Sequence, residues 1–182
     1  YSNIRKVSYM LLSCGMAEVL FFILAIAFNY PMPLVAIQLL WLNIVTDGLQ
    51  DFALSFEKSE KGIMREKPIS TKESIFNKRL LTEVLIAGLT IGITIFIVWV
   101  ILIDKIGMDI QLARAYIMTL MVFMQNMHVL NCRSEKTSIF KTPIKTNPFI
   151  IFSILSALIL QFIVCEVPFF SKFLQVGSIP LI

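Results

Sequence analysis

The sequence predicts an all-α, polytopic helical membrane protein with five transmembrane helices and an outer loop. The first observation is hydrophobicity: 57% of the 182 residues are hydrophobic and the mean hydropathy is +0.81, as in proteins that cross the bilayer several times. The second is the distribution of the charged residues along the sequence. They collect between apolar runs of about 20 residues, the length that a helix needs to span the hydrocarbon core of a membrane. A soluble core requires neither feature.

Charge and cysteine usage exclude several classes of function. The net charge is +4, but the basic residues flank apolar runs without aromatic interleaving or a groove-reading motif, so we expect no nucleic-acid partner. The three cysteines are far apart and form no C-x-x-C pair, which argues against a disulfide framework and a soft-metal site. The start at Tyr1 has neither an initiator Met nor a signal-peptide layout. We therefore expect a longer protein to precede it.

Two apolar segments at the amino end predict a helical hairpin. The first covers residues 7–28, the second covers 34–54, and the five residues between them include two prolines. So short a connection requires antiparallel, neighbouring helices. Glu18 and Asp47 lie at about the same distance along the chain from the shared turn, so we expect their carboxylates at a similar depth in the membrane.

The second segment carries a polar stripe within an arc of roughly 140° on a 3.6-residue period. The stripe consists of Asn43, Thr46, Asp47, Gln50 and Asp51. An ionised carboxylate at the bilayer centre costs about 2.5–3.5 kcal/mol on insertion scales, and such residues usually mark an ion or proton path. Residues 1–54 are therefore predicted to form a hairpin that carries a cation half-site. The alternatives are a soluble amphipathic helix for the stripe and a neutral or snorkelling Glu18 in a helix contact.

Residues 55–79 form the longest polar connection and hold seven Lys or Arg. The positive-inside rule makes this loop cytoplasmic. Its charges predict a solvated face, with docking to a cytoplasmic domain as the alternative.

Residues 80–182 are predicted to supply supporting transmembrane helices and the outer loop. The helices cover about 80–103, 110–131 and 148–167, and the first contains Gly88-x-x-x-Gly92, a spacing that lets helix backbones approach closely in lipid. The tail after Pro168 is too short and too broken for another span. With a cytoplasmic amino end, thirteen of the sixteen Lys and Arg fall on the cytoplasmic side, which supports this orientation.

The polar membrane residues suit a hard cation. Ca²⁺ takes about six to eight oxygen ligands, and this chain offers about five donors: Glu18, Asn43, Thr46, Asp47 and Gln125. Two carboxylates would balance one divalent charge, and the remaining ligands must come from elsewhere. His128 is expected to be a helix-contact residue, since no second His or Cys stands at ligand spacing. The energy source must also lie elsewhere, because the sequence has no G-x-x-x-x-G-K-[ST] phosphate loop.

Three stretches closely resemble the P-type cation-transporting ATPases, the calcium-pump branch in particular. They are Gln38-Leu-Leu-Trp-Leu-Asn-Ile-Val-Thr-Asp-Gly-Leu, Ala53-Leu-Ser-Phe-Glu57 and Ile63-Met-Arg-Glu-Lys-Pro68, which look like the sixth membrane helix of that family and the loop after it. The resemblance covers the whole chain and implies the family's helices five to nine plus an outer loop. The phosphorylation, nucleotide-binding and actuator domains, with the first four helices, would precede Tyr1.

The resemblance also implies residue roles. Asn43 and Asp47 match ion ligands of the family's sixth helix, Thr46 matches a neighbouring ligand, and Glu18 matches the fifth-helix carboxylate. Gln125 falls where some calcium pumps have Glu and others have Gln. Among the departures, Gly15 stands where two-site pumps have an Asn ligand, and Gln50-Asp51 replaces a common Pro-Ala pair. A complete second ion site is therefore not implied.

One motif is a decoy. Asp104-Lys-Ile-Gly is similar to the family's phosphorylated Asp-Lys-Thr-Gly, but it occupies a short outer loop. We expect no catalytic role for it.

The leading hypothesis is the carboxy-terminal membrane part of an ATP-driven pump for Ca²⁺ or a related cation, located in the plasma membrane. ATP and Mg²⁺ would act only through the preceding domains, so this chain alone should not hydrolyse ATP. Its partners would be the N-terminal part of the same pump and the lipid bilayer. The alternatives are a free-standing helical membrane protein with a binding or assembly role, and a pump for Mn²⁺ or a monovalent cation.

Overall fold

The computed structural model describes residues 2–58, 77–134 and 142–177, and these contain helices and turns but no strand. The prediction of an all-α membrane fold is confirmed. The elements are α1 (Ser2–Ala27), α2 (Ala36–Leu42), the π-helix η1 (Asn43–Gly48), α3 (Leu49–Ser55), α4 (Lys78–Val100), the π-helix η3 (Ile101–Lys105), α5 (Ile110–Cys132), the 3₁₀-helix η5 (Ile144–Thr146), α6 (Pro148–Glu166) and α7 (Pro168–Phe173). Most of the predicted cytoplasmic loop 55–79 lies outside the described residues.

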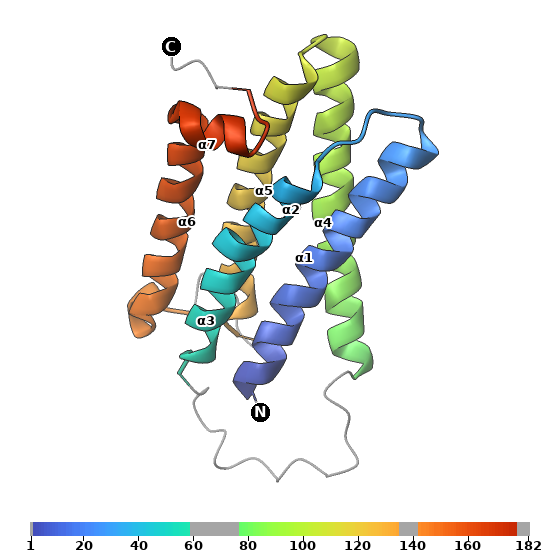
Figure 1. The fold of residues 1–182 in the computed structure, drawn as a ribbon. Coiled ribbons are helices and arrows are strands. Elements are labelled where there is room, and N and C mark those ends of the chain that lie inside the picture. Colours follow the sequence, from blue (N-terminus) through green and yellow to red (C-terminus); the bar gives the residue numbers. More distant parts are fainter. Residues whose placement is uncertain (1, 59–76, 135–141, 178–182) are drawn as a thin grey trace.

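The long helices lie side by side in one bundle, and α7 lies across one end of it (Figure 1). The composite helix α2–η1–α3 runs between α1 and α6, and α3 contacts both. α1 makes its most extensive contact with α4. The largest cluster of buried apolar side chains joins α1, the composite helix and α4 to α5 and α6, so one face of the composite helix packs against protein and the opposite face is exposed.

Three helical stretches are long and apolar enough to cross a membrane by length and composition: Ser2–Ala27, Lys78–Lys105 and Pro148–Glu166. They correspond to three of the five predicted spans. The other two predicted spans are present as the composite helix α2–η1–α3 and as α5. The first of these is interrupted by a π-helix, and polar residues gather near the end of the second.

Side-chain caps begin three of the helices. Asn77 accepts a hydrogen bond from the Leu80 N–H at 2.9 Å at the start of α4. Asp109 and Asn147 cap α5 and α6 in the same way, and Pro148 occupies the first turn of α6, where its missing N–H costs nothing. These caps satisfy N–H groups that the first turn of a helix leaves unpaired.

The contact between α1 and α4 depends on the two small residues of the Gly-x-x-x-Gly pattern. A Cβ atom on Gly92 would lie 2.9 Å from the Ala17 carbonyl oxygen, and one on Gly88 would lie 3.0 Å from Met16. A side chain at Gly92 would push the two helix backbones apart, and one at Gly88 would require the Met16 side chain to shift. The close approach that the spacing predicts is therefore present, and it fixes the position of α1.

Candidate cation site

Three of the five predicted ligands lie on the π-helix η1, which interrupts the second hairpin helix over Asn43–Gly48. The predicted helix over 34–54 is present without a break from Ala36 to Ser55, but its period is wider than 3.6 residues over Asn43–Gly48. A π turn is wider than an α turn, and single π turns occur frequently at functional sites. Of the five residues of the predicted polar stripe, four are buried or half-buried and Asn43 is exposed.

The ligands on η1 therefore differ in environment. Thr46 is fully buried, and its hydroxyl donates a hydrogen bond to the Leu42 carbonyl oxygen at 2.6 Å. Asp47 is also buried, whereas the Asn43 side chain is exposed. Asp47 and Thr46 thus face the protein interior, and Asn43 faces the outside of the described bundle.

The other two predicted ligands come from α1 and α5. Glu18 and Gln125 are both buried, and the Gln125 amide donates to the Glu18 carboxylate with an N–O separation of 3.5 Å. The Glu18 carboxylate lies close enough to Asp47 to interact with it electrostatically, and the Cys14 thiol lies beside Asp47. The structure thus brings Glu18, Asp47 and Gln125 together from three separate elements.

Several oxygens in this region are buried without a hydrogen-bond partner. They are Asp47 Oδ1, Gln125 Oε1, Gln50 Oε1, Asp51 Oδ1 and Ser13 Oγ. Within the described part of the chain, no Lys or Arg forms an ion pair with the carboxylates of Glu18, Asp47 and Asp51. Buried polar groups are normally paired, and an uncompensated buried charge is unfavourable. Among the described residues, these buried oxygens therefore remain without a protein partner.

The acidic, thiol and imidazole side chains of the described residues do not gather into a metal site of their own. Among residues 2–58, 77–134 and 142–177, no three His, Cys, Asp or Glu side chains come together to hold a metal ion. Gln125 and Thr46 add neutral oxygens to this region, which are also acceptable ligands for a hard cation. The His128 Nε2 atom lies 3.4 Å from the Cys132 Sγ atom, and the centroids of the His128 and Tyr9 rings are 5.0 Å apart. His128 on α5 thus contacts α1 through Tyr9, as predicted for a helix-contact residue.

Sequence reasoning did not identify all the polar residues near the site. Gln50 is fully buried, and its amide nitrogen donates to Asn126 Oδ1 on α5, while Gln50 Oε1 and Asn126 Nδ2 remain unpaired. Gln50 belongs to the predicted polar stripe, but its pairing with Asn126 depends on how the helices pack. Ser13 carried no sequence signal, and only its burial reveals it.

A second buried polar network lies where α3, α5 and α6 meet. Arg133 forms two hydrogen bonds of 3.0 Å with the Glu57 carboxylate. Asn147 donates to the same carboxylate and to the Ala53 carbonyl, each at 2.9 Å. The network holds the end of the hairpin against the start of α6.

Comparison with known proteins agrees with this geometry. A family model described as "Cation transporting ATPase, C-terminus" matches residues 31–182. The "Calcium-transporting ATPase" of Bacillus subtilis (strain 168) is 34% identical over 168 residues, which cover 92% of this chain and 19% of that protein. The "Calcium-transporting ATPase type 2C member 1" of Homo sapiens is 29% identical over 183 residues, which cover all of this chain and 20% of that protein.

The chain thus spans about a fifth of the length of these relatives. The family match covers most of the chain, and the helical membrane architecture agrees with it. The chain belongs to the family of cation-transporting ATPases, whose carboxy-terminal region it matches.

Proposed function

We propose that this chain is the carboxy-terminal membrane part of an ATP-driven Ca²⁺ pump and supplies part of the shell that coordinates the transported ion. The observation that carries the proposal is the group of buried, unpaired oxygens around Glu18 and Asp47. The similarity to proteins named calcium-transporting ATPases supports Ca²⁺ as the ion.

Each proposed ligand has a distinct part. Glu18 and Asp47 supply two negative charges that balance one divalent ion, and Gln125 supplies a neutral amide oxygen. The Thr46 hydroxyl donates its proton to Leu42, so its lone pairs remain available to a cation. Asn43 can join the shell only if another part of the protein covers its exposed side. The incomplete ligand set thus assigns the remaining ligands to the rest of the pump.

The arrangement also suggests how affinity could change during transport. Glu18 lies on α1, whereas Asp47 lies on the π-helix, so a shift of α1 changes the distance between the two carboxylates. Calcium binds tightly when both carboxylates reach it and weakly when one withdraws. Phosphorylation in the preceding part of the pump would drive that shift.

The proposed topology places the amino end and the loop 55–79 in the cytoplasm and the protein in the plasma membrane. The excess of Lys and Arg on one side supports it. The partners would be the N-terminal part of the same pump and the lipid bilayer.

The test uses the intact protein. The change Asp47→Asn should abolish Ca²⁺-dependent phosphorylation by ATP, because it removes one of the two charges. The matched control is Asp104→Asn, which alters an exposed carboxyl on the π-helix η3 and should leave phosphorylation unchanged, because the new amide oxygen can still accept the hydrogen bond from Tyr30. Normal phosphorylation of the Asp47→Asn protein would refute the proposal. Competition of Ca²⁺ uptake by Mn²⁺ and by monovalent cations would identify the ion.

A further inference from the structure

A group of soft donor atoms lies where α1 packs against the end of α5. The Met10 thioether sulfur lies 4.0 Å from the Cys132 thiol sulfur, and the same thiol lies 3.4 Å from the His128 Nε2 atom. The Cys14 thiol approaches the Met10 sulfur at 3.9 Å. All four side chains are buried, and none is more than 4% exposed. Packing thus gathers three sulfur atoms and an imidazole from two helices that are far apart in the sequence.

Two of these donors stand one turn apart on α5. Cys132 follows His128 by four residues, so the two side chains share one face of the helix. The expectation for His128 found no Cys at ligand spacing, and Cys132 corrects it. The acidic, thiol and imidazole side chains of the described residues form no group of three here. The third donor is the Met10 thioether, which belongs to none of these classes.

The separations suit ligands that share one metal ion. Metal–sulfur bonds of about 2.3 Å and metal–nitrogen bonds of about 2.0–2.1 Å place two ligand atoms of one tetrahedral or trigonal ion roughly 3.5–4.0 Å apart. The contacts of Cys132 with Met10 and with His128 are close to this spacing. A methionine side chain has three rotatable bonds, so the Met10 sulfur can move toward His128 and complete the set.

We propose that Met10, Cys132 and His128 bind a soft monovalent metal ion of the Cu(I) class. Thiolate and thioether ligands select Cu(I), and imidazole also suits copper. The ion would replace the thiol proton of Cys132, which leaves to water, so the metal thiolate carries no net charge. A neutral group suits this buried position, because an uncompensated charge there is unfavourable. A hard ion such as Ca²⁺ takes oxygen ligands, so this site differs in chemistry from the proposed cation site.

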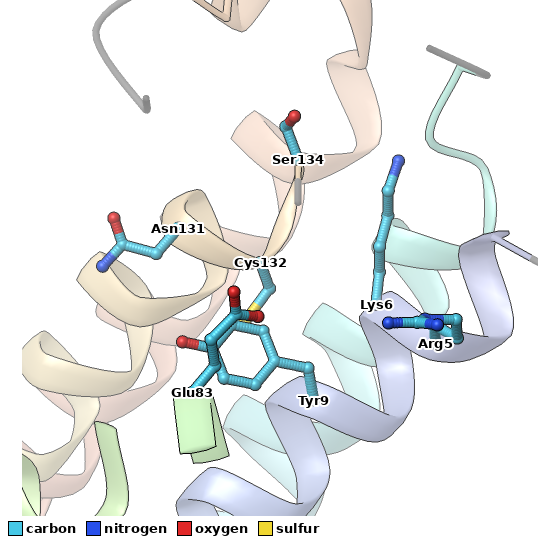
Figure 2. Close-up of a pocket in the computed structure, with 7 residues that line it drawn as sticks. All are labelled: Arg5, Lys6, Tyr9, Glu83, Asn131, Cys132 and Ser134. Carbon is cyan, nitrogen blue, oxygen red and sulfur yellow. The ribbon is translucent and has the colours of Figure 1, made fainter. Parts of the chain in front are cut away.

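Two hollows give an ion access to these side chains. Cys132 lines a cavity of about 150 Å³ between α1, α4 and the end of α5, and Figure 2 shows it among the side chains around this cavity. His128 lines a groove of about 500 Å³ between α4 and α5. A water molecule needs roughly 10–15 Å³ of such space, so either hollow can admit a metal ion.

The experiment uses the intact protein, purified in detergent with its cysteines reduced. Ag(I) is the probe, because it shares the ligand preference of Cu(I) and is stable in air. Native mass spectrometry counts the retained ions, and thermal unfolding is followed in parallel. Thiols elsewhere in the protein also bind Ag(I), so the site is measured as the difference between the wild type and its variants. An ion that joins α1 to α5 should raise the melting temperature.

The change Met10→Leu is decisive, because it removes the thioether and leaves every thiol in place. Met and Leu have similar volumes, so the variant should fold. Its affinity for the ion should fall about tenfold, the effect of about 1.4 kcal/mol. The matched control is Met118→Leu, which alters another fully buried methionine and should bind Ag(I) as the wild type does.

The other two ligands are tested in the same way. Cys132→Ala should lose one retained ion and the rise in melting temperature. Its control, Cys165→Ala, removes a buried thiol beside Thr119 and Gln161 and should keep both. His128→Asn should weaken binding as Met10→Leu does. Wild-type affinity in both of these variants would show that a thiol alone holds the ion and would overturn the proposal, as would the absence of any retained ion that depends on Cys132.

Discussion

The buried pair Arg133–Glu57 gives the sharpest stability prediction. The two side chains are only 1% and 4% exposed, and Arg133 supplies two of the hydrogen bonds that hold the Glu57 carboxylate. Arg133→Met would remove both bonds and leave a buried carboxylate with Asn147 as its remaining side-chain donor. Charge-assisted bonds contribute about 1.5–3 kcal/mol each, and breaking one side of a buried pair costs about 3–5 kcal/mol. We therefore expect a loss of about 3–5 kcal/mol.

Thermal unfolding in detergent can measure this loss. For a chain of this size, 1 kcal/mol corresponds to a shift of about 2–4 °C, so Arg133→Met should lower the melting temperature by roughly 6–20 °C. The double change Arg133→Met with Glu57→Leu should recover most of the loss, because buried ion pairs can often be replaced by apolar side chains.

The matched control is the exposed pair Arg79–Glu83, whose side chains are 58% and 30% exposed. Arg79→Met should cost under about 0.5 kcal/mol, as is usual for i,i+4 pairs on a helix surface. Equal effects of Arg79→Met and Arg133→Met would refute the reasoning, because burial would then make no difference. An unrecovered double variant would show that Arg133 acts mainly through Pro143 and Thr146.

Three further predictions can be checked by the same unfolding assay. Gly92→Ala should destabilise the protein by about 1–3 kcal/mol, because the new Cβ atom would lie 2.9 Å from the Ala17 backbone. Gly15→Ala is its control: a Cβ atom there has no neighbour within 4 Å, so this change should stabilise the protein by about 0.5–1 kcal/mol. Gln50→Leu should cost about 1–3 kcal/mol, because Asn126 loses its partner, and adding Asn126→Leu should reduce the cost. Gln38→Leu should lower the free energy of unfolding by a similar amount, because the Gln38 amide on α2 donates a hydrogen bond to the Leu174 carbonyl oxygen at 2.9 Å. Hydrogen exchange of the backbone amides that follow α7 should also become faster.

The main features of the fold could be predicted from the sequence because they depend on local signals. Apolar runs predict the helices, and the structure adds Asn77, Asp109 and Asn147 as the caps that begin three of them. The spacing of Gly88 and Gly92 is also local, and it correctly predicts a close helix contact. Each of these features is encoded within one or two helical turns, where sequence and structure correspond closely.

Other features depend on packing and could not be predicted. The π-helix over Asn43–Gly48 has the same composition as an α-helix, so hydrophobic period alone does not reveal it. Glu57 and Arg133 are 76 residues apart, and Arg133 counted in the sequence only as a charge outside the membrane. Lys6 was likewise interpreted as a flanking charge, although it is buried. In each case the neighbours that decide the role are distant in sequence.

The exposure of Asn43 separates two explanations for the polar stripe. Asn43 lies between exposed apolar residues, since Leu40 is 53% and Ile44 is 59% exposed. A polar amide that faces lipid is unfavourable, so if Asn43 faced only lipid, Asn43→Leu would leave Ca²⁺ affinity unchanged and raise stability. If the rest of the pump covers this face and Asn43 completes the shell, Asn43→Leu should lower the Ca²⁺ affinity of the intact protein about tenfold, the effect of about 1.4 kcal/mol. Ile44→Leu, on the same face, serves as the control and should leave the affinity unchanged. Calcium-dependent phosphorylation, titrated in both variants, decides between the two, and an unchanged affinity in Asn43→Leu would remove Asn43 from the ligand set.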